Sequence, residues 1–366
     1  MNNNELLSTT LKDIYAHLAD EESRDIFIPR FEHIFHAGEH EEALISMMHK
    51  AILWDVNRTP YKRWNIGDSI TIGEYLKHKN AFDSICIWGA GRCGKLTLRI
   101  LNQFGLSVEC FLDNDKAKVG TRYLDKPVYS SEKIFSDYHN AYIFIGMFYP
   151  YAWQVIQQLR DSRFPSERII LMYSVEEQYF GTGLIEPRED EVYYDVGVFD
   201  GATIDAFIRF SNNRYKQIIG IEADKKNYDY LLDKYKNKDI LRLINKGAWN
   251  ESGTFKFNSC LDSAISKIDD IGETLLETTT IDKITEELQL TPTFIKMDIE
   301  GAELKALEGA EKTIKHCHPR LAISVYHKAE DIADILHYIL RLVPEYKFYL
   351  RQHTYHFAET VLYCMV

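Results

Sequence analysis

The chain has 366 residues, 45% of them hydrophobic and 27% charged, an ordinary balance for a globular protein of two domains. Its formal net charge of −12 argues against a nucleic-acid backbone or an anionic membrane surface as the main partner. The six cysteines include no Cys-x-x-Cys pair, and we find neither a signal peptide nor an apolar run long enough to span a bilayer. We therefore expect a cytoplasmic protein in a reducing compartment, with no nucleic acid and no membrane span.

Residues 1–80 are expected to form a helical extension. Within residues 5–55, apolar residues recur at spacings of three and four, as at Leu11, Ile14 and Leu18. This region contains no chemical motif. Packing, or the formation of an oligomer through these helices, is its expected use.

Residues 81–180 show the first of two strand–glycine-loop–helix patterns. An apolar run over 84–88 precedes a glycine-rich loop and a helix, and an acidic residue ends the following strand. The residues concerned are Gly89, Gly91, Gly94 and Asp113. This is the fingerprint of a Rossmann-like dinucleotide fold, in which the loop holds a pyrophosphate at the helix N-terminus. We expect a nucleotide or nucleotide sugar here, and a fold retained without a ligand remains the alternative.

The second pattern begins at the strand Val192–Val196 and differs from the first because its loop contains acidic residues. The loop residues are Asp195, Gly197, Asp200, Gly201 and Thr203. Glycines allow close approach of the backbone to a ligand, but carboxylates in the loop would repel a pyrophosphate. They suit a ligand with ammonium and hydroxyl groups, such as S-adenosylmethionine (SAM).

Further candidates follow the later strands of this second unit. Glu222 ends the next strand, where a carboxylate can accept the ribose hydroxyls of an adenosine, and Ala248 is small enough for the adenine to lie against the backbone. Asp298 ends the strand Thr293–Met297, and in an open α/β sheet it should face the same crevice as Asp195.

Three more side chains near Asp298 are candidates for the chemistry. Glu300 and Glu303 begin a helix expected over Ala302–Ile314, where acidic residues also act as caps. His327 follows the strand Leu321–Val325 and is a candidate base. We assign catalytic roles to Asp298, Glu300 and His327. No residue set predicts a metal site, although a divalent ion held by Asp298 and Glu300 remains an alternative to the base.

A polar cluster near the C-terminus is a weaker candidate for the acceptor site. Arg351, His353 and His356 lie on or beside the penultimate strand, Tyr346–Leu350. The chain then ends on the strand Thr360–Cys364. A final strand pair of this kind is expected of SAM-dependent methyltransferases.

From about Glu191 to Val366 the chain resembles the FkbM family of SAM-dependent O-methyltransferases. The resemblance rests on the two motifs Asp195-x-Gly197-x-x-Asp200-Gly201-x-Thr203 and Lys296-Met-Asp-Ile-Glu-Gly-Ala-Glu303, with Ile221-Glu-Ala-Asp224 and Tyr326-His-Lys328. It implies a class I methyltransferase sheet, SAM as cofactor, and the hydroxyl of a sugar, polysaccharide or related natural product as acceptor. By this resemblance Asp195, Gly197 and Gly201 hold the methionine part, Glu222 the ribose, and Asp298 lies near the transferred methyl. Ala202 departs from the family, whose members often have an acid there.

The sequence thus predicts an α/β protein with two doubly wound Rossmann-like domains. Residues 1–80 are the helical extension, 81–180 the nucleotide-binding-type domain, and 185–366 the methyltransferase domain. The expected activity is SAM-dependent O-methylation of a sugar or glycan. Two alternatives remain open: a non-catalytic nucleotide-sensing or scaffold protein, and an NAD-dependent sugar oxidoreductase run by the first domain.

Overall fold

The computed structural model describes residues 11–35, 41–57, 70–80, 83–147, 151–172, 178–238, 240–258, 267–268, 274–354 and 358–366. The chain divides into two compact units. The C-terminal unit comprises the described residues of 1–35, 178–351 and 359–366, and the N-terminal unit those of 36–177 and 352–358. The expected extension over 1–80 is therefore shared between the two. None of the described helices has the length and apolar character needed to cross a membrane.

The N-terminal unit is built around a seven-stranded sheet in the order β1-β7-β6-β2-β3-β5-β4. Its strands are β1 (Ile70–Thr71), β2 (Ile85–Trp88), β3 (Cys110–Leu112), β4 (Arg122–Tyr123), β5 (Lys126–Tyr129), β6 (Tyr142–Ile145) and β7 (Ile169–Leu171). Its helices are α3 (Glu41–Asn57), α4 (Ile72–His78), α5 (Arg92–Gln103), α6 (Lys133–Ser136) and α7 (Tyr151–Asp161), with a 3-10 turn, η1, at Ser166–Arg168. All strand pairs are parallel except β4 with β5. The first predicted domain is thus a Rossmann-like α/β fold.

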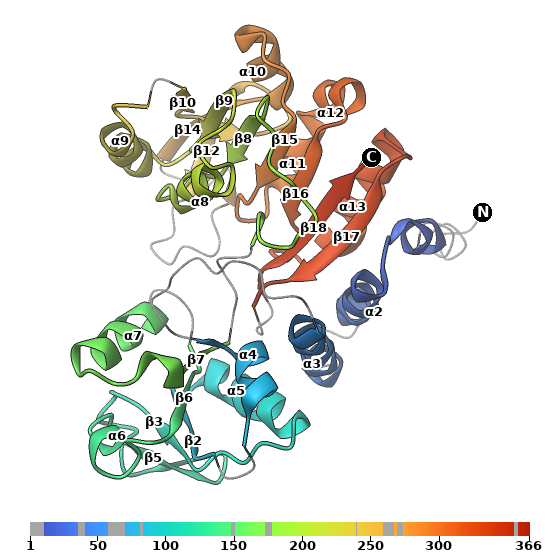
Figure 1. The fold of residues 1–366 in the computed structure, drawn as a ribbon. Coiled ribbons are helices and arrows are strands. Elements are labelled where there is room, and N and C mark those ends of the chain that lie inside the picture. Colours follow the sequence, from blue (N-terminus) through green and yellow to red (C-terminus); the bar gives the residue numbers. More distant parts are fainter. Residues whose placement is uncertain are drawn as a thin grey trace. The chain divides into compact units, whose positions relative to one another are not determined.

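The C-terminal unit contains a second seven-stranded sheet, in the order β10-β9-β8-β15-β16-β18-β17 (Figure 1). Its strands are β8 (Val192–Val196), β9 (Gln217–Ile221), β10 (Leu241–Ile244), β15 (Phe294–Met297), β16 (Arg320–Ser324), β17 (Lys347–Gln352) and β18 (Thr360–Met365). The first five run parallel, and β18 lies antiparallel beside β16. The last strand is therefore inserted between β16 and β17. This is a Rossmann-like sheet that ends on a strand pair, as the sequence predicts.

Helices connect these strands, and α2 from the N-terminal region belongs to the same unit. They are α2 (Glu21–Phe35), α8 (Ala202–Phe210), α9 (Lys225–Lys234), α10 (Ile281–Leu288), α11 (Glu303–Glu308), α12 (Glu311–Cys317) and α13 (Asp331–Leu342). Aromatic side chains fill the core beneath β8, where the Tyr193 and Phe207 rings stack with centroids 4.3 Å apart. Phe180 packs against both Tyr193 and Phe294. The core therefore anchors the strands whose ends carry the predicted site.

One helix differs from the expected pattern, and the chain after β10 forms a further sheet. The single helix expected over Ala302–Ile314 is wrong, because α11 and α12 are separate helices with Gly309 and Ala310 between them. A Cβ at Gly309 would lie 2.0 Å from the carbonyl oxygen of Trp249, so this close approach requires glycine. The insertion after β10 forms a four-stranded sheet, in the order β11-β14-β12-β13. Its strands are β11 (Gly247–Ala248), β12 (Gly253–Asn258), β13 (Lys267–Ile268) and β14 (Thr274–Thr279).

Candidate active site

The candidate site lies at the carboxyl ends of the parallel strands of the C-terminal unit. From β8 the chain adds β9 and β10 on one side, while β15 and β16 lie on the other. The order therefore reverses between β8 and β15, and ligands of open α/β sheets bind at such a point. Asp195 on β8 and Lys296 on β15 are register partners there.

A buried ion pair joins these two strands. Lys296 Nζ lies 3.1 Å from Asp195 Oδ1, and the two side chains are 2% and 0% exposed. The same ammonium donates to the carbonyl oxygen of Gly197 at 2.7 Å, and the Thr203 hydroxyl donates to Asp195 Oδ2. Asp195 and Thr203 are therefore engaged in holding the β8 loop. Lys296, to which we assigned no role from the sequence, is the central member of this network.

Glycine is required at two positions of the β8 loop. Gly197 has a φ of +85°, and a Cβ there would lie 2.0 Å from the carbonyl oxygen of Asp298. Gly201 has a φ of +83° and begins α8. Asp200 Oδ1 accepts the N–H of Ala202 at 2.9 Å, so this carboxylate closes the turn into the helix. The loop is thus a tight turn with little room for larger residues.

Glu222, at the end of β9, is tied to the same loop. Its Oε2 accepts the N–H of Phe199 and its Oε1 the N–H of Asp224, both at 2.8 Å. Burial raises the pKa of Glu222, and the two backbone donors partly offset this. Ala248 is buried on β11, where it pairs with Thr279 of β14. Glu222 and Ala248, the residues expected beside the adenosine, thus come after β9 and β10, respectively.

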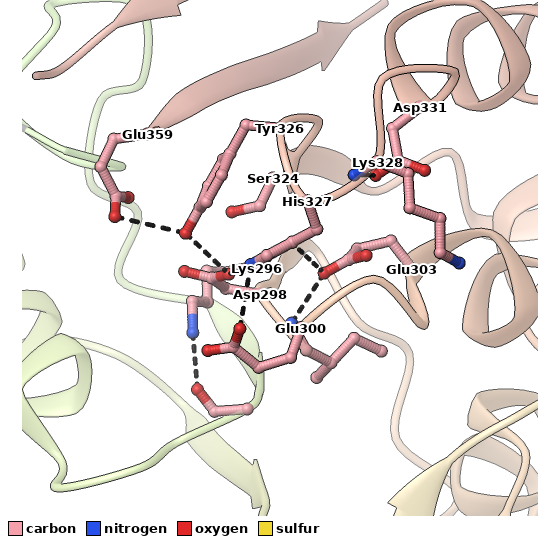
Figure 2. Close-up of polar contacts among 12 residues, drawn as sticks. Lys296, Asp298, Glu300, Glu303, Ser324, Tyr326, His327, Lys328, Asp331 and Glu359 are labelled. Atoms are coloured by element: carbon pink, nitrogen blue, oxygen red, sulfur yellow. Dashed lines mark hydrogen bonds and ion pairs between the residues drawn. The ribbon is translucent and has the colours of Figure 1, made fainter. Parts of the chain in front are cut away.

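Asp298 lies just beyond β15 at the centre of a polar cluster (Figure 2). Its Oδ2 accepts the hydroxyl of Tyr179 at 2.8 Å, whereas its Oδ1 makes longer contacts with the Tyr326 hydroxyl at 3.4 Å and His327 Nε2 at 3.5 Å. Burial and the nearby Asp298 carboxylate raise the pKa of both tyrosines. Both phenols therefore stay protonated at neutral pH and act as donors.

His327 lies between three carboxylates, and its side chain is 9% exposed. Nδ1 is 3.1 Å from Glu303 Oε1, and Nε2 is 3.5 Å from both Asp298 and Glu300. Glu303 is fully buried and accepts the N–H of Ile299 at 2.8 Å. Burial disfavours the imidazolium, but the carboxylates outweigh it and raise the pKa of His327 to about 9. Asp298, Glu300 and His327 are thus together as expected, and Glu303 joins them.

Two further members of the cluster come from distant parts of the chain. Glu359, just before β18, accepts the Tyr326 hydroxyl at 3.2 Å and a hydrogen bond from the Gln178 amide. Burial, with Asp298 nearby, raises the pKa of Glu359 to about 7. Sequence reasoning missed Glu359, Gln178 and Tyr179, because no motif contains them. The positive φ of 64° at Glu359 was not readable from the sequence either.

In the N-terminal unit the first glycine loop has the expected strand, turn and helix. Gly89 has a φ of +118°, and a Cβ at Gly94 would lie 1.9 Å from its carbonyl oxygen, whereas a Cβ at Gly91 would meet open space. Asp113 accepts the N–H of Ala90 at 2.9 Å and pairs with Lys118 at 3.0 Å. Asp113, the residue expected to bind a ribose, therefore stabilises the glycine loop through Ala90.

In the polar cluster expected near the C-terminus, Arg351 forms ion pairs within the protein. This buried guanidinium pairs with Asp20 at 2.7 Å and with Glu22 at 3.2 Å, and so joins β17 to α2. His353 is buried, and His356 lies outside the described residues. An acceptor-binding role for Arg351 therefore has no support in its contacts.

Comparison with known proteins identifies the domain that contains this site. The methyltransferase FkbM domain matches residues 195–357. A solved methyltransferase FkbM from Methylobacillus flagellatus is similar at 20% identity and a TM-score of 0.48, covering 87% of this chain and 99% of that one. Fibrillarin from Aeropyrum pernix, solved with S-adenosyl-L-methionine, is similar at 11% identity and a TM-score of 0.34, covering 50% and 70%. No curated protein sequence matches the chain. The matched residues include Asp195, Glu222, Asp298 and His327 of the candidate site.

Proposed function

We propose that this protein is a SAM-dependent O-methyltransferase that acts in the cytoplasm on a hydroxyl of a sugar, polysaccharide or related natural product. Methyl transfer is assigned to the domain expected over 185–366. The domain expected over 81–180 is proposed to bind or recognise a ligand without a chemical role. The FkbM domain supports methyl transfer, whereas the sugar acceptor comes from the family resemblance alone.

The observation that carries the proposal is the arrangement of carboxylates around the β8–β15 switch point. Glu222 uses one acceptor position on each oxygen for a backbone N–H, and a carboxylate has about four such positions. It therefore retains capacity for two ribose hydroxyls. Asp298 follows β15, the strand beside β8, and its Oδ1 makes only long contacts. This donor set fits an adenosine and a cationic sulfonium better than it fits a pyrophosphate.

When bound, SAM would supply an activated methyl group on a sulfonium. The chain's own residues then have two tasks. The first is alignment, since proximity and orientation contribute roughly 7–11 kcal/mol to such reactions. The rigid β8 loop, fixed by Lys296, performs it. The second is activation of the acceptor hydroxyl by the group around Asp298 and His327, worth about 10²–10⁴-fold.

Calorimetry with SAM and with NAD(H) tests the proposal. We expect SAM to bind and Glu222→Ala or Asp195→Ala to remove most of that binding, whereas Glu286→Ala, an exposed acid on α10, should leave it unchanged. His327→Ala should slow methyl transfer but leave measurable activity and SAM affinity. Mass spectrometry on nucleotide sugars and glycans would identify the acceptor. If SAM fails to bind the wild-type chain, the proposal is wrong.

A further inference from the structure

Four side chains with metal-binding groups converge beside β15 and β16. Asp298 and Glu300 come from the turn after β15, Glu303 begins α11, and His327 follows β16. Asp298, Glu303 and His327 each bring one ligand atom within 4.8 Å of the other two. Glu300, whose side chain is 47% exposed, places Oε2 3.5 Å from His327 Nε2 on the open side. Three carboxylates therefore surround a single imidazole.

The buried part of this cluster is incompletely satisfied by its neighbours. Glu303 is 0% exposed, and its Oε2 has no hydrogen-bond partner among the residues that the structure describes. The two lysines that Figure 2 shows beside the cluster are used elsewhere. Lys328 Nζ donates to the carbonyl oxygen of Gly301, and Lys296 Nζ is held by Gly197 and Asp195. Three carboxylates share one imidazole here, so the cluster carries an excess of negative charge that a further cation would offset.

The geometry of His327 also argues against the imidazole acting alone as a base. Both ring nitrogens face carboxylates, Nδ1 toward Glu303 and Nε2 toward Asp298 and Glu300 (Figure 2). Neither nitrogen is without a carboxylate oxygen within 3.5 Å.

The local backbone directs these groups toward one point. Glu300 has a φ of 56° and Gly301 a φ of 92°, so the chain reverses sharply after Asp298 and returns Glu300 toward His327. The N–H of Ile299 fixes Glu303 at 2.8 Å. Such left-handed residues are uncommon outside glycine and concentrate at functional sites.

We propose that Asp298, Glu303 and His327, with Glu300 on the open side, bind one divalent cation of the Mn²⁺ or Mg²⁺ class. Oxygen ligands with one imidazole suit these hard ions better than thiolate-seeking metals. This inference rests on the proposed function for its use: the cation would hold the acceptor hydroxyl and lower its pKa, replacing a free base. The displaced proton of the hydroxyl leaves to solvent or to a neighbouring carboxylate.

Mn²⁺ binding to the full chain tests the site directly. After treatment with a chelator and gel filtration, the protein is titrated with Mn²⁺ while the EPR signal of free Mn²⁺ is followed. We expect one saturable site per chain. Glu303→Gln should weaken binding by at least the roughly 10–100-fold that the loss of an outer-shell partner costs, whereas the matched control Glu286→Gln should leave it unchanged. Circular dichroism checks that the variants fold. If Glu303→Gln does not fold, Mn²⁺ binding is measured on Glu300→Gln, whose replaced side chain is half-exposed.

The site and the proposed function fail in different ways. Absence of saturable Mn²⁺ binding, or binding unaffected by both Glu303→Gln and Glu300→Gln, overturns the cation site and leaves SAM binding untouched. SAM calorimetry on the same metal-free samples reports the proposed function separately. If methyl transfer runs at its full rate in chelated protein, the activating role of the cation is refuted.

Discussion

The buried pair of Lys296 and Asp195 offers the sharpest test of how the site is held together. Lys296→Met keeps an unbranched side chain of similar length and removes only the ammonium. Asp195 would then be a fully buried carboxylate that keeps the Thr203 hydroxyl as a donor but loses its ion pair. The carbonyl oxygen of Gly197 would also lose its donor. Both losses occur where β8 and β15 meet, so we expect the whole C-terminal unit to be destabilised.

The expected magnitude follows from the burial of the pair. Removing one partner of a buried ion pair costs about 3–5 kcal/mol, because the other charge is left uncompensated. The lost hydrogen bond to Gly197 contributes about 1 kcal/mol within this sum. For a unit of this size, each kcal/mol lowers the melting temperature by roughly 2–4 °C. Lys296→Met should therefore melt about 6–20 °C below the wild type.

Hydrogen–deuterium exchange measured across a temperature series, on peptides covering β8 and β15, reports this unit by itself. The control is the double variant Lys296→Met with Asp195→Asn, which removes both charges and retains an oxygen that accepts from Thr203. Because replacing a buried ion pair with neutral residues is often nearly neutral, the double variant should recover most of the loss. If the double variant melts as low as the sum of the two single variants predicts, uncompensated charge is not the cause and the reasoning is refuted.

Two further predictions concern the backbone and the N-terminal helix. Gly197→Ala should abolish SAM binding in calorimetry, because its Cβ would lie 2.0 Å from the Asp298 carbonyl oxygen; Gly105→Ala, also at positive φ but beside open space, should cost only about 1–2 kcal/mol of stability and leave SAM binding unchanged. Asp20→Asn should lower the melting temperature, because Arg351 loses a partner in a buried network. Although burial opposes it, Arg351 holds the pKa of Asp20 below its usual value, so this stabilisation is present above about pH 4 and is lost as the pH falls further. The difference between Asp20→Asn and the wild type should therefore shrink in melts at pH 3.

The parts of the site that were predictable lie at the ends of parallel strands. β8 has the predicted bounds, and strand topology alone brings Asp298 close to His327. Glu359 and Tyr179 were not predictable, because their positions depend on β18 inserting beside β16 in antiparallel orientation. A sequence gives no local signal for that insertion.

Ion pairs between residues far apart in the sequence could not be predicted either. Arg351 was expected at an acceptor site, but it pairs with Asp20 and Glu22, more than three hundred residues away in the chain. Any of the acidic residues could have been its partner from composition alone. Lys296 was hidden for a different reason: a lysine within an apolar strand signals a buried charge, but its partner Asp195 is identified only by the register of β8 and β15.

The two glycine loops share a device that their sequences do not reveal. In each unit, the acid that follows the next strand after the glycine loop accepts a backbone N–H of that loop. Asp113, after β3, accepts from Ala90, and Glu222, after β9, accepts from Phe199. In both units this acid therefore stabilises the conformation of the glycine loop. The two differ in their charge pairing, because Asp113 also pairs with the ammonium of Lys118, whereas Glu222 has no ion pair among the residues that the structure describes. A ligand with ribose hydroxyls therefore meets a neutralised acid in the N-terminal unit and an available one in the C-terminal unit. This difference in pairing, more than the glycine spacing, is why we propose that the cofactor binds beside Glu222.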